Sequence, residues 1–85
     1  MPMARFFFDT DDGGLALQDD CGLELDCAAS ALTEARRAIA ALAADVEAHT
    51  AATLGPREVF LTVRSELGVA ILALTLSLVV QRFGP

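Results

Sequence analysis

The sequence predicts an α+β protein of the order ββαββ, in which a four-stranded antiparallel sheet carries one long helix packed on one face. Large apolar residues alternate along residues 69–82, in register with a second alternating run across a short turn. Between the two expected hairpins, apolar residues recur at intervals of three and four, which is one face of a helix. A chain of 85 residues has room for a single domain, residues 1–85.

The first hairpin is expected over residues 4–18. Its three consecutive phenylalanines suit a pleated, half-buried strand. Asp12 and Gly13 are expected to form a two-residue turn, because both residue types tolerate the positive φ that such a turn demands. This turn would pair Phe8 with Leu17 on the face directed at the helix.

The helix is expected over residues 27–49, which contain many alanines and neither Gly nor Pro. A polar loop, residues 19–26, precedes it, and Asp26 is the expected N-cap because a carboxylate there accepts unpaired backbone N–H groups. Gly55 and Pro56 are expected to act as a breaker that ends the helical segment. The predicted apolar stripe consists of Leu32, Ala35, Ile39, Leu42 and Val46.

The second hairpin is expected over residues 57–82, with strands at 57–65 and 69–82 and a turn at Leu67 and Gly68. We expect the extra length of the last strand, roughly residues 78–82, to pair with the first strand. The predicted pairs are Val63 with Leu72, Leu61 with Leu74, and Val59 with Leu76. The predicted core face of the sheet carries Phe6, Phe8, Leu15, Leu17, Val59, Leu61, Val63, Leu72, Leu74, Leu76, Leu78 and Val80.

Composition and charge restrict the classes of partner. The net charge is −6 and all six basic residues are Arg, so the chain as a whole repels phosphate backbones and anionic membrane surfaces. The longest uncharged stretch, residues 67–81, is shorter than the roughly 20 residues a membrane helix needs and alternates as a strand does. We expect a cytoplasmic protein that binds neither nucleic acid nor membrane.

The cluster that most resembles a functional site is acidic and consists of Asp9, Asp11, Asp12, Asp19 and Asp20. Their spacing faintly resembles a calcium loop, but Gly13 occupies a ligand position and a strand follows. We expect these side chains to serve turns and a solvated loop.

His49, the single histidine, is expected at the end of the helix, where a cation complements the helix dipole. Five residues separate Cys21 from Cys27, which is neither a redox pair nor half of a zinc site. Reduced thiols are the simplest interpretation, with a disulfide or a reactive thiol as alternatives. Glu34 and Arg37 are spaced for a helical ion pair.

The sheet face opposite the helix is the candidate interface. Hydrophobic residues make up 54% of the chain and the mean hydropathy is +0.50, more apolar material than one small core needs. An open sheet also leaves two unpaired edges. We therefore expect a homodimer that forms through this face or an edge. The candidate interface residues are Phe7, Phe60, Thr62, Ile71, Ala73 and Thr75.

Four segments are similar to a family of short bacterial proteins catalogued as a domain of unknown function. They are Arg5-Phe-Phe-Phe-Asp9, Asp11-Asp-Gly13, Gly22-Leu-Glu-Leu25 and Glu34-Ala-Arg-Arg-Ala-Ile39. The resemblance implies the helix and the two hairpins, and no activity. The sequence departs from the family pattern at Asp26-Cys27, where Pro-Asp is usual, and at Leu67, where the turn before Gly68 is usually polar.

These observations predict a non-catalytic protein-interaction or regulatory module without a cofactor. Neither a nucleophile–base pair nor a phosphate loop nor a set of metal ligands is recognisable in the sequence. Two alternatives stay open: an antitoxin-like regulator that binds a partner protein, and a small metal-binding protein that uses the loops between Asp9 and Asp20.

Overall fold

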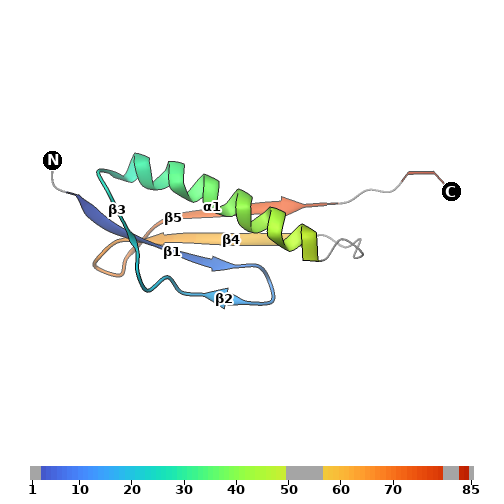
Figure 1. Cartoon of the computed structure of the whole chain (residues 1–85), viewed down its shortest axis with the longest axis horizontal. Helices are drawn as coiled ribbons and strands as arrows, with labels where there is room; N and C mark the ends of the chain where they lie inside the picture. The colour runs from blue at the N-terminus through green and yellow to red at the C-terminus, as the bar shows by residue number, and fades with distance from the viewer. Residues whose placement is uncertain (1–2, 50–56, 80–82, 85) are drawn as a thin grey trace.

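The computed structural model describes residues 3–49, 57–79 and 83–84, and it confirms the α+β class with one strand more than expected (Figure 1). One helix packs on a sheet whose strands follow the order β2-β1-β4-β5, while β3 pairs with β1. The elements are β1 (Ala4–Asp11), β2 (Ala16–Leu17), β3 (Leu23–Leu25), α1 (Ala28–His49), β4 (Arg57–Arg64) and β5 (Ala70–Leu78).

The β4–β5 hairpin has the predicted register. Val63 lies opposite Leu72, and the pairing continues with alternate apolar residues facing α1. The connection is a three-residue loop rather than a two-residue turn, because the N–H of Ser65 donates to the carbonyl of Val69 at 2.8 Å. Gly68 takes a φ of +79°, which closes the loop in the left-handed conformation that glycine allows.

The first hairpin has a different register from the predicted one. Thr10, rather than Phe8, lies opposite Leu17, so the turn is centred on Gly13 and Gly14, one residue later than predicted. The carboxylate of Asp12 accepts the N–H of Leu15 at 2.8 Å, and the N–H of Asp12 donates to the carbonyl of Leu15 at 3.2 Å. This local hydrogen bonding stabilises the turn at Gly13 and Gly14.

β2 lies outside the core. Leu15 and Leu17 are 58% and 57% exposed, so the prediction that they pack in the core beneath the helix is wrong. The reason is the position of α1, which contacts β1, β3, β4 and β5 but not β2.

The predicted polar loop at 19–26 contains a strand, β3, whose residues pair with the N-terminal half of β1. Backbone N–H groups along a strand point alternately to its two edges. The N–H of Arg5 donates to Glu66, which follows β4, and the N–H of Phe8 donates to Asp19, which lies between β2 and β3. We conclude that β2 and β3 are two parts of one return strand along the same edge of β1.

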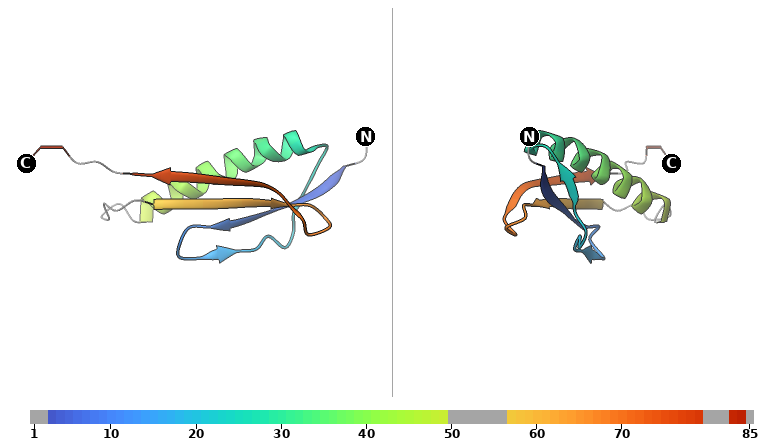
Figure 2. Two further views of the ribbon diagram at one scale, coloured as in Figure 1. Left: turned by 180° about the vertical axis from the view of Figure 1, so that it is seen from behind. Right: turned by 60° about the vertical axis from the view of Figure 1, so that its left-hand side comes forward.

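The strand order differs from the expected one. β1 pairs with β4 from Phe7–Arg64 to Asp11–Phe60, and β5 lies at an outer edge with β2 at the other (Figure 2). The end of β5 therefore does not pair with β1, since Leu78 lies opposite Arg57. β4 therefore lies between β1 and β5, and this central place accounts for the burial of Val59, Leu61 and Val63. Residues 80–82 of the predicted strand lie outside the described part of the chain.

The helix begins at Ala28, one residue later than predicted, and ends at His49 as expected. Asp26 accepts a hydrogen bond from the hydroxyl of Ser30, and Cys27 holds the position just before the first helical residue. The predicted N-cap is thus displaced by one residue.

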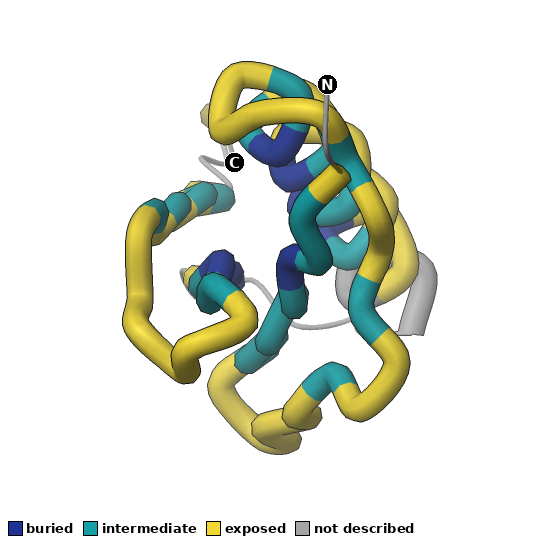
Figure 3. The backbone as a smooth tube through the Cα atoms, turned by 90° about the vertical axis from the view of Figure 1, so that its left-hand side faces the viewer, coloured by how far each residue is buried: buried dark blue, intermediate teal, exposed yellow. Residues whose placement is uncertain are grey.

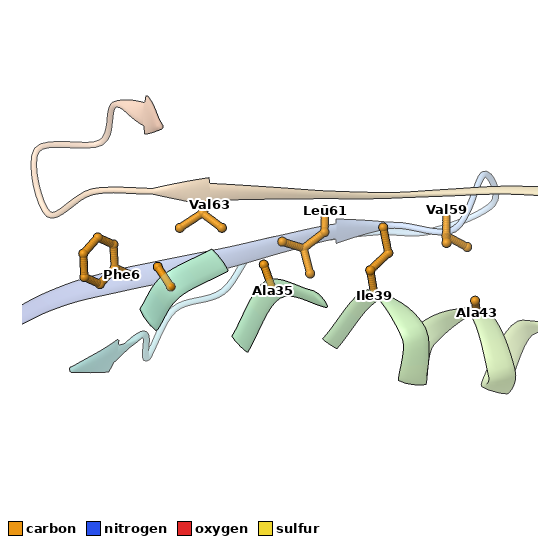
Figure 4. Packing of buried hydrophobic residues seen from close by; sticks show 8 residues of the cluster. Phe6, Ala35, Ile39, Ala43, Val59, Leu61 and Val63 are labelled. Carbon is orange, nitrogen blue, oxygen red and sulfur yellow. The ribbon is translucent and has the colours of Figure 1, made fainter. Parts of the chain in front are cut away.

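Alanines form much of the contact between α1 and the sheet. Figure 4 shows Val59, Leu61 and Val63 of β4 directed at α1. Of the predicted stripe, Ala35 and Ile39 are buried, Leu32 and Leu42 are half-buried, and the side chain of Val46 lies outside the description. The buried row on the helix is Ala31, Ala35, Ile39 and Ala43, spaced every four residues. Small side chains along this row let the helix backbone approach the sheet closely, which the pattern of large residues alone did not reveal.

Burial falls from β4 to β5. Val59, Leu61 and Val63 are at most 1% exposed, whereas the leucines of β5 that pack against the same core are only half-buried. Figure 3 shows the buried segments gathered between the helix and the middle of the sheet. The core is therefore complete over β4 and incomplete at the β5 edge.

Candidate functional site

The sheet face opposite α1 holds the predicted interface residues, and no described element lies over it. Phe60 of β4 lies opposite Thr75 of β5, and Thr62 lies opposite Ala73. Cross-strand partners on one face are in contact distance, so these four residues form one contiguous patch.

Phe60 and Ile71 are the large apolar residues of this patch, 39% and 40% exposed. Ile71 lies beside the irregularity between Val63 and Arg64, where the ladder gains a residue on β5. Phe60 is central, with Thr62 two residues further along the same strand face. The patch therefore has an aromatic centre, bordered by small residues on β5 and by the carboxylate of Asp11 on β1.

Phe7 is placed apart from the other predicted residues. The guanidinium carbon of Arg64 lies 5.0 Å from the centre of its ring, within cation–π distance. A Cβ on Gly22 would lie 3.0 Å from the same ring, so the ring packs against the backbone there. Phe7 is thus half-buried, and its ring serves packing within the domain more than it contributes to the free surface.

A network of charged groups at the Phe7 end of this face was not predicted from the sequence. Arg64 donates from Nε to Oδ2 of Asp9 at 2.5 Å and from Nη2 to Oδ1 at 3.1 Å. The same Nη2 donates to the backbone carbonyl of Asp19 at 3.1 Å. The N–H of Asp19 in turn donates to Asp9 at 2.9 Å. Strand alternation places Asp9 and Arg64 on this face, but the predicted interface included only apolar and small residues.

The carboxyl groups of Asp9 and Asp19 both have a pKa below the ordinary value of 3.8. For Asp9 the hydrogen bond from Arg64 is the main cause, opposed by burial and supported by the N–H of Asp19. For Asp19, burial pushes the pKa upward, but the backbone N–H groups of Gly22, Phe8 and Cys21 together outweigh it. The carboxylate of Asp19 thus takes the place of a strand partner, because it accepts hydrogen bonds from backbone N–H groups that no strand reaches.

An open hollow of about 450 Å³ lies beside this network, between β1, β2 and β4. Asp9 and Asp11 contribute carboxylates to its wall, and Phe60 contributes an aromatic surface. A smaller hollow of about 340 Å³ adjoins it at the hairpin loop and shares Phe60. Both hollows have carboxylate residues and the ring of Phe60 in their lining.

The acidic loop residues act mainly on their own backbone. Asp11 accepts the N–H of Gly13 at 2.8 Å, and Asp12 accepts those of Gly14 and Leu15. Within residues 3–49, 57–79 and 83–84, no group of three or more His, Cys, Asp or Glu side chains is arranged to hold a metal ion.

The remaining candidates are dispersed. Cys21, just before β3, and Cys27, between β3 and α1, are exposed free thiols. Glu34 and Arg37 form the predicted helical ion pair at 3.1 Å. Among the described helices, none is both long and apolar enough to cross a membrane.

The fold and this face define a class: a small α+β domain with a helix on one side of its sheet and an open, partly apolar surface on the other. Residues 5–77 match the family described as domain of unknown function DUF6894, and the chain belongs to that family. No curated protein matches the sequence. No solved structure matches it either.

Proposed function

We propose that this protein is a non-catalytic interaction module that works as a homodimer. The observation that supports the proposal most directly is the apolar surface that one helix leaves uncovered. Phe60 and Ile71 stay about two-fifths exposed on the open face, and the leucines of β5 remain half-buried on the other. Burial of such surface against a second chain is one way for a small domain to complete its core.

A role in binding also fits the polar groups. The charged side chains of the open face are used to join strands, as Arg64 joins β1 to the loop before β3. Side chains engaged in this way stiffen a recognition surface. Catalysis would instead need a reactive side chain that is available beside a substrate site.

Size-exclusion chromatography with light scattering tests the proposal. Over a dilution series we expect a mass near twice the 8.9 kDa of the chain, falling toward one chain only at the lowest concentrations. A mass of 8.9 kDa that persists at high micromolar concentration contradicts the homodimer.

A further inference from the structure

We infer that two copies join through the outer edges of their β5 strands, which pair antiparallel to form one continuous sheet. This inference rests on the proposed homodimer and adds the contact that makes it. Its first support is composition: β5 spans nine residues, Ala70–Leu78, and carries no charge and no proline. In a chain of net charge −6, a charge-free strand is where a second copy approaches with least repulsion.

The direction of the backbone groups is the second support. Because the N–H of Phe8 points toward Asp19, alternation directs the peptide groups of Phe7 and its alternate neighbours to β4. We follow the same alternation from β1 through β4 to β5. It directs the peptide groups of Leu72, Leu74 and Leu76 toward β4. The N–H and carbonyl groups of Ala73, Thr75 and Ser77 therefore point outward, unpaired within the described chain.

The third support is the incomplete core. Leu72, Leu74 and Leu76 face α1 but remain half-buried, in contrast to their fully buried partners on β4. A two-fold axis perpendicular to the sheet keeps both helices on the same side. The leucines of the two copies would then meet in one layer, each set covering the other.

The register follows from symmetry. In a two-fold antiparallel pair each residue meets the residue reflected about the strand centre. The register that pairs all nine residues sets Leu74 opposite Leu74 of the second copy, as a pair without mutual hydrogen bonds. Ala73 then exchanges hydrogen bonds with Thr75 of the second copy.

Cross-linking tests this register. The background is the Cys21→Ser, Cys27→Ser double variant, since both native thiols are exposed. Ala73→Cys and Thr75→Cys chains, mixed and oxidised, should form a disulfide-linked pair, because the expected Cα separation is about 5.5 Å. Either variant alone should link poorly, because like positions would lie roughly 8–9 Å apart. Equal cross-linking in the separate and mixed samples would overturn the register.

A proline distinguishes the edge from the open face. The N–H of Thr75 points outward, so Thr75→Pro removes no bond to β4 but blocks edge pairing. We expect a folded monomer by circular dichroism and light scattering, while Thr75→Val and Phe60→Lys remain dimeric. A dimer that survives Thr75→Pro but dissociates with Phe60→Lys overturns the edge contact and leaves the homodimer standing. A wild-type monomer refutes both proposals. If Thr75→Pro fails to fold, the cross-linking result decides.

Discussion

The guanidinium of Arg64 at the end of β4 and the carboxylate of Asp9 in the middle of β1 form a two-point ion pair across the sheet, with Nε–Oδ2 at 2.5 Å. The side chains are 22% and 24% exposed, so water screens this pair less than a surface pair. Through the carbonyl of Asp19, the same guanidinium also holds the loop between β2 and β3.

Asp9→Asn tests the strength of this link. The substitution keeps the shape and removes the charge, and we expect the free energy of unfolding to fall by roughly 1–2 kcal/mol in urea titrations. The matched control is Glu34→Gln on the exposed helical pair, with an expected loss of at most about 0.5 kcal/mol. Equal losses at the two sites would refute a structural role for the Asp9–Arg64 pair.

Stability should decline in acid because of Asp9 and Asp19. Both carboxyl groups have a pKa below the ordinary 3.8 in the folded chain, so the unfolded chain takes up protons first as the pH falls. Their stabilisation is fully present above about pH 4 to 5 and is lost as the pH falls through the folded pKa values. Unfolding curves at a series of pH values should show this decline, with a shallower slope for Asp9→Asn. An unchanged slope in that variant would assign the decline to other groups.

Gly22→Ala should be severely destabilising. Gly22 has a φ of +71°, and an added Cβ would lie 2.8 Å from Cγ of Arg5 and 3.0 Å from the carbonyl oxygen of Phe6. Gly68→Ala is the control, since its φ of +79° is similar but nothing lies within 4 Å. We expect a loss of about 1–2 kcal/mol for Gly68→Ala, the backbone cost alone. Gly22→Ala should lose more than that by thermal melting. Similar losses would mean that the close approach at Gly22 relaxes without cost.

Ala35→Leu should push α1 away from the sheet. Ala35 is fully buried against β4, and extra methylenes in a packed core typically cost about 1–3 kcal/mol. Ala40→Leu on the exposed helix face should leave the free energy of unfolding nearly unchanged, because both residues favour helix. Chemical denaturation of both variants compares them directly, and a neutral Ala35→Leu would contradict the tight helix–sheet contact.

Calcium should leave the protein unaffected. The carboxylates of Asp12 and Asp19 are already directed at backbone N–H groups, which a cation would have to displace. We expect the same melting temperature in millimolar Ca²⁺ and in chelator. A rise that saturates with Ca²⁺ would instead support the metal-binding alternative.

The sequence by itself determined the second hairpin and the helix. Val63 and Leu72 lie in the predicted register because a slip of one residue would move every leucine off the core face, and the short connection at Gly68 limits larger slips. The helix was equally readable from residues 27–49, since alanine-rich sequence and a three-four spacing act locally. The open-face pair of Phe60 with Thr75 followed from the same register.

Only the tertiary structure decided the strand order, the first hairpin and the polar network. The turn lies at Gly13 and Gly14 instead of Asp12 and Gly13, where the carboxylate of Asp12 bonds to nearby amides, a choice that short-range pattern does not settle. The link between Asp9 and Arg64 spans 55 residues and exists because β4 lies beside β1. Local periodicity shows which way a side chain points, whereas the neighbour it meets depends on how distant strands are brought together.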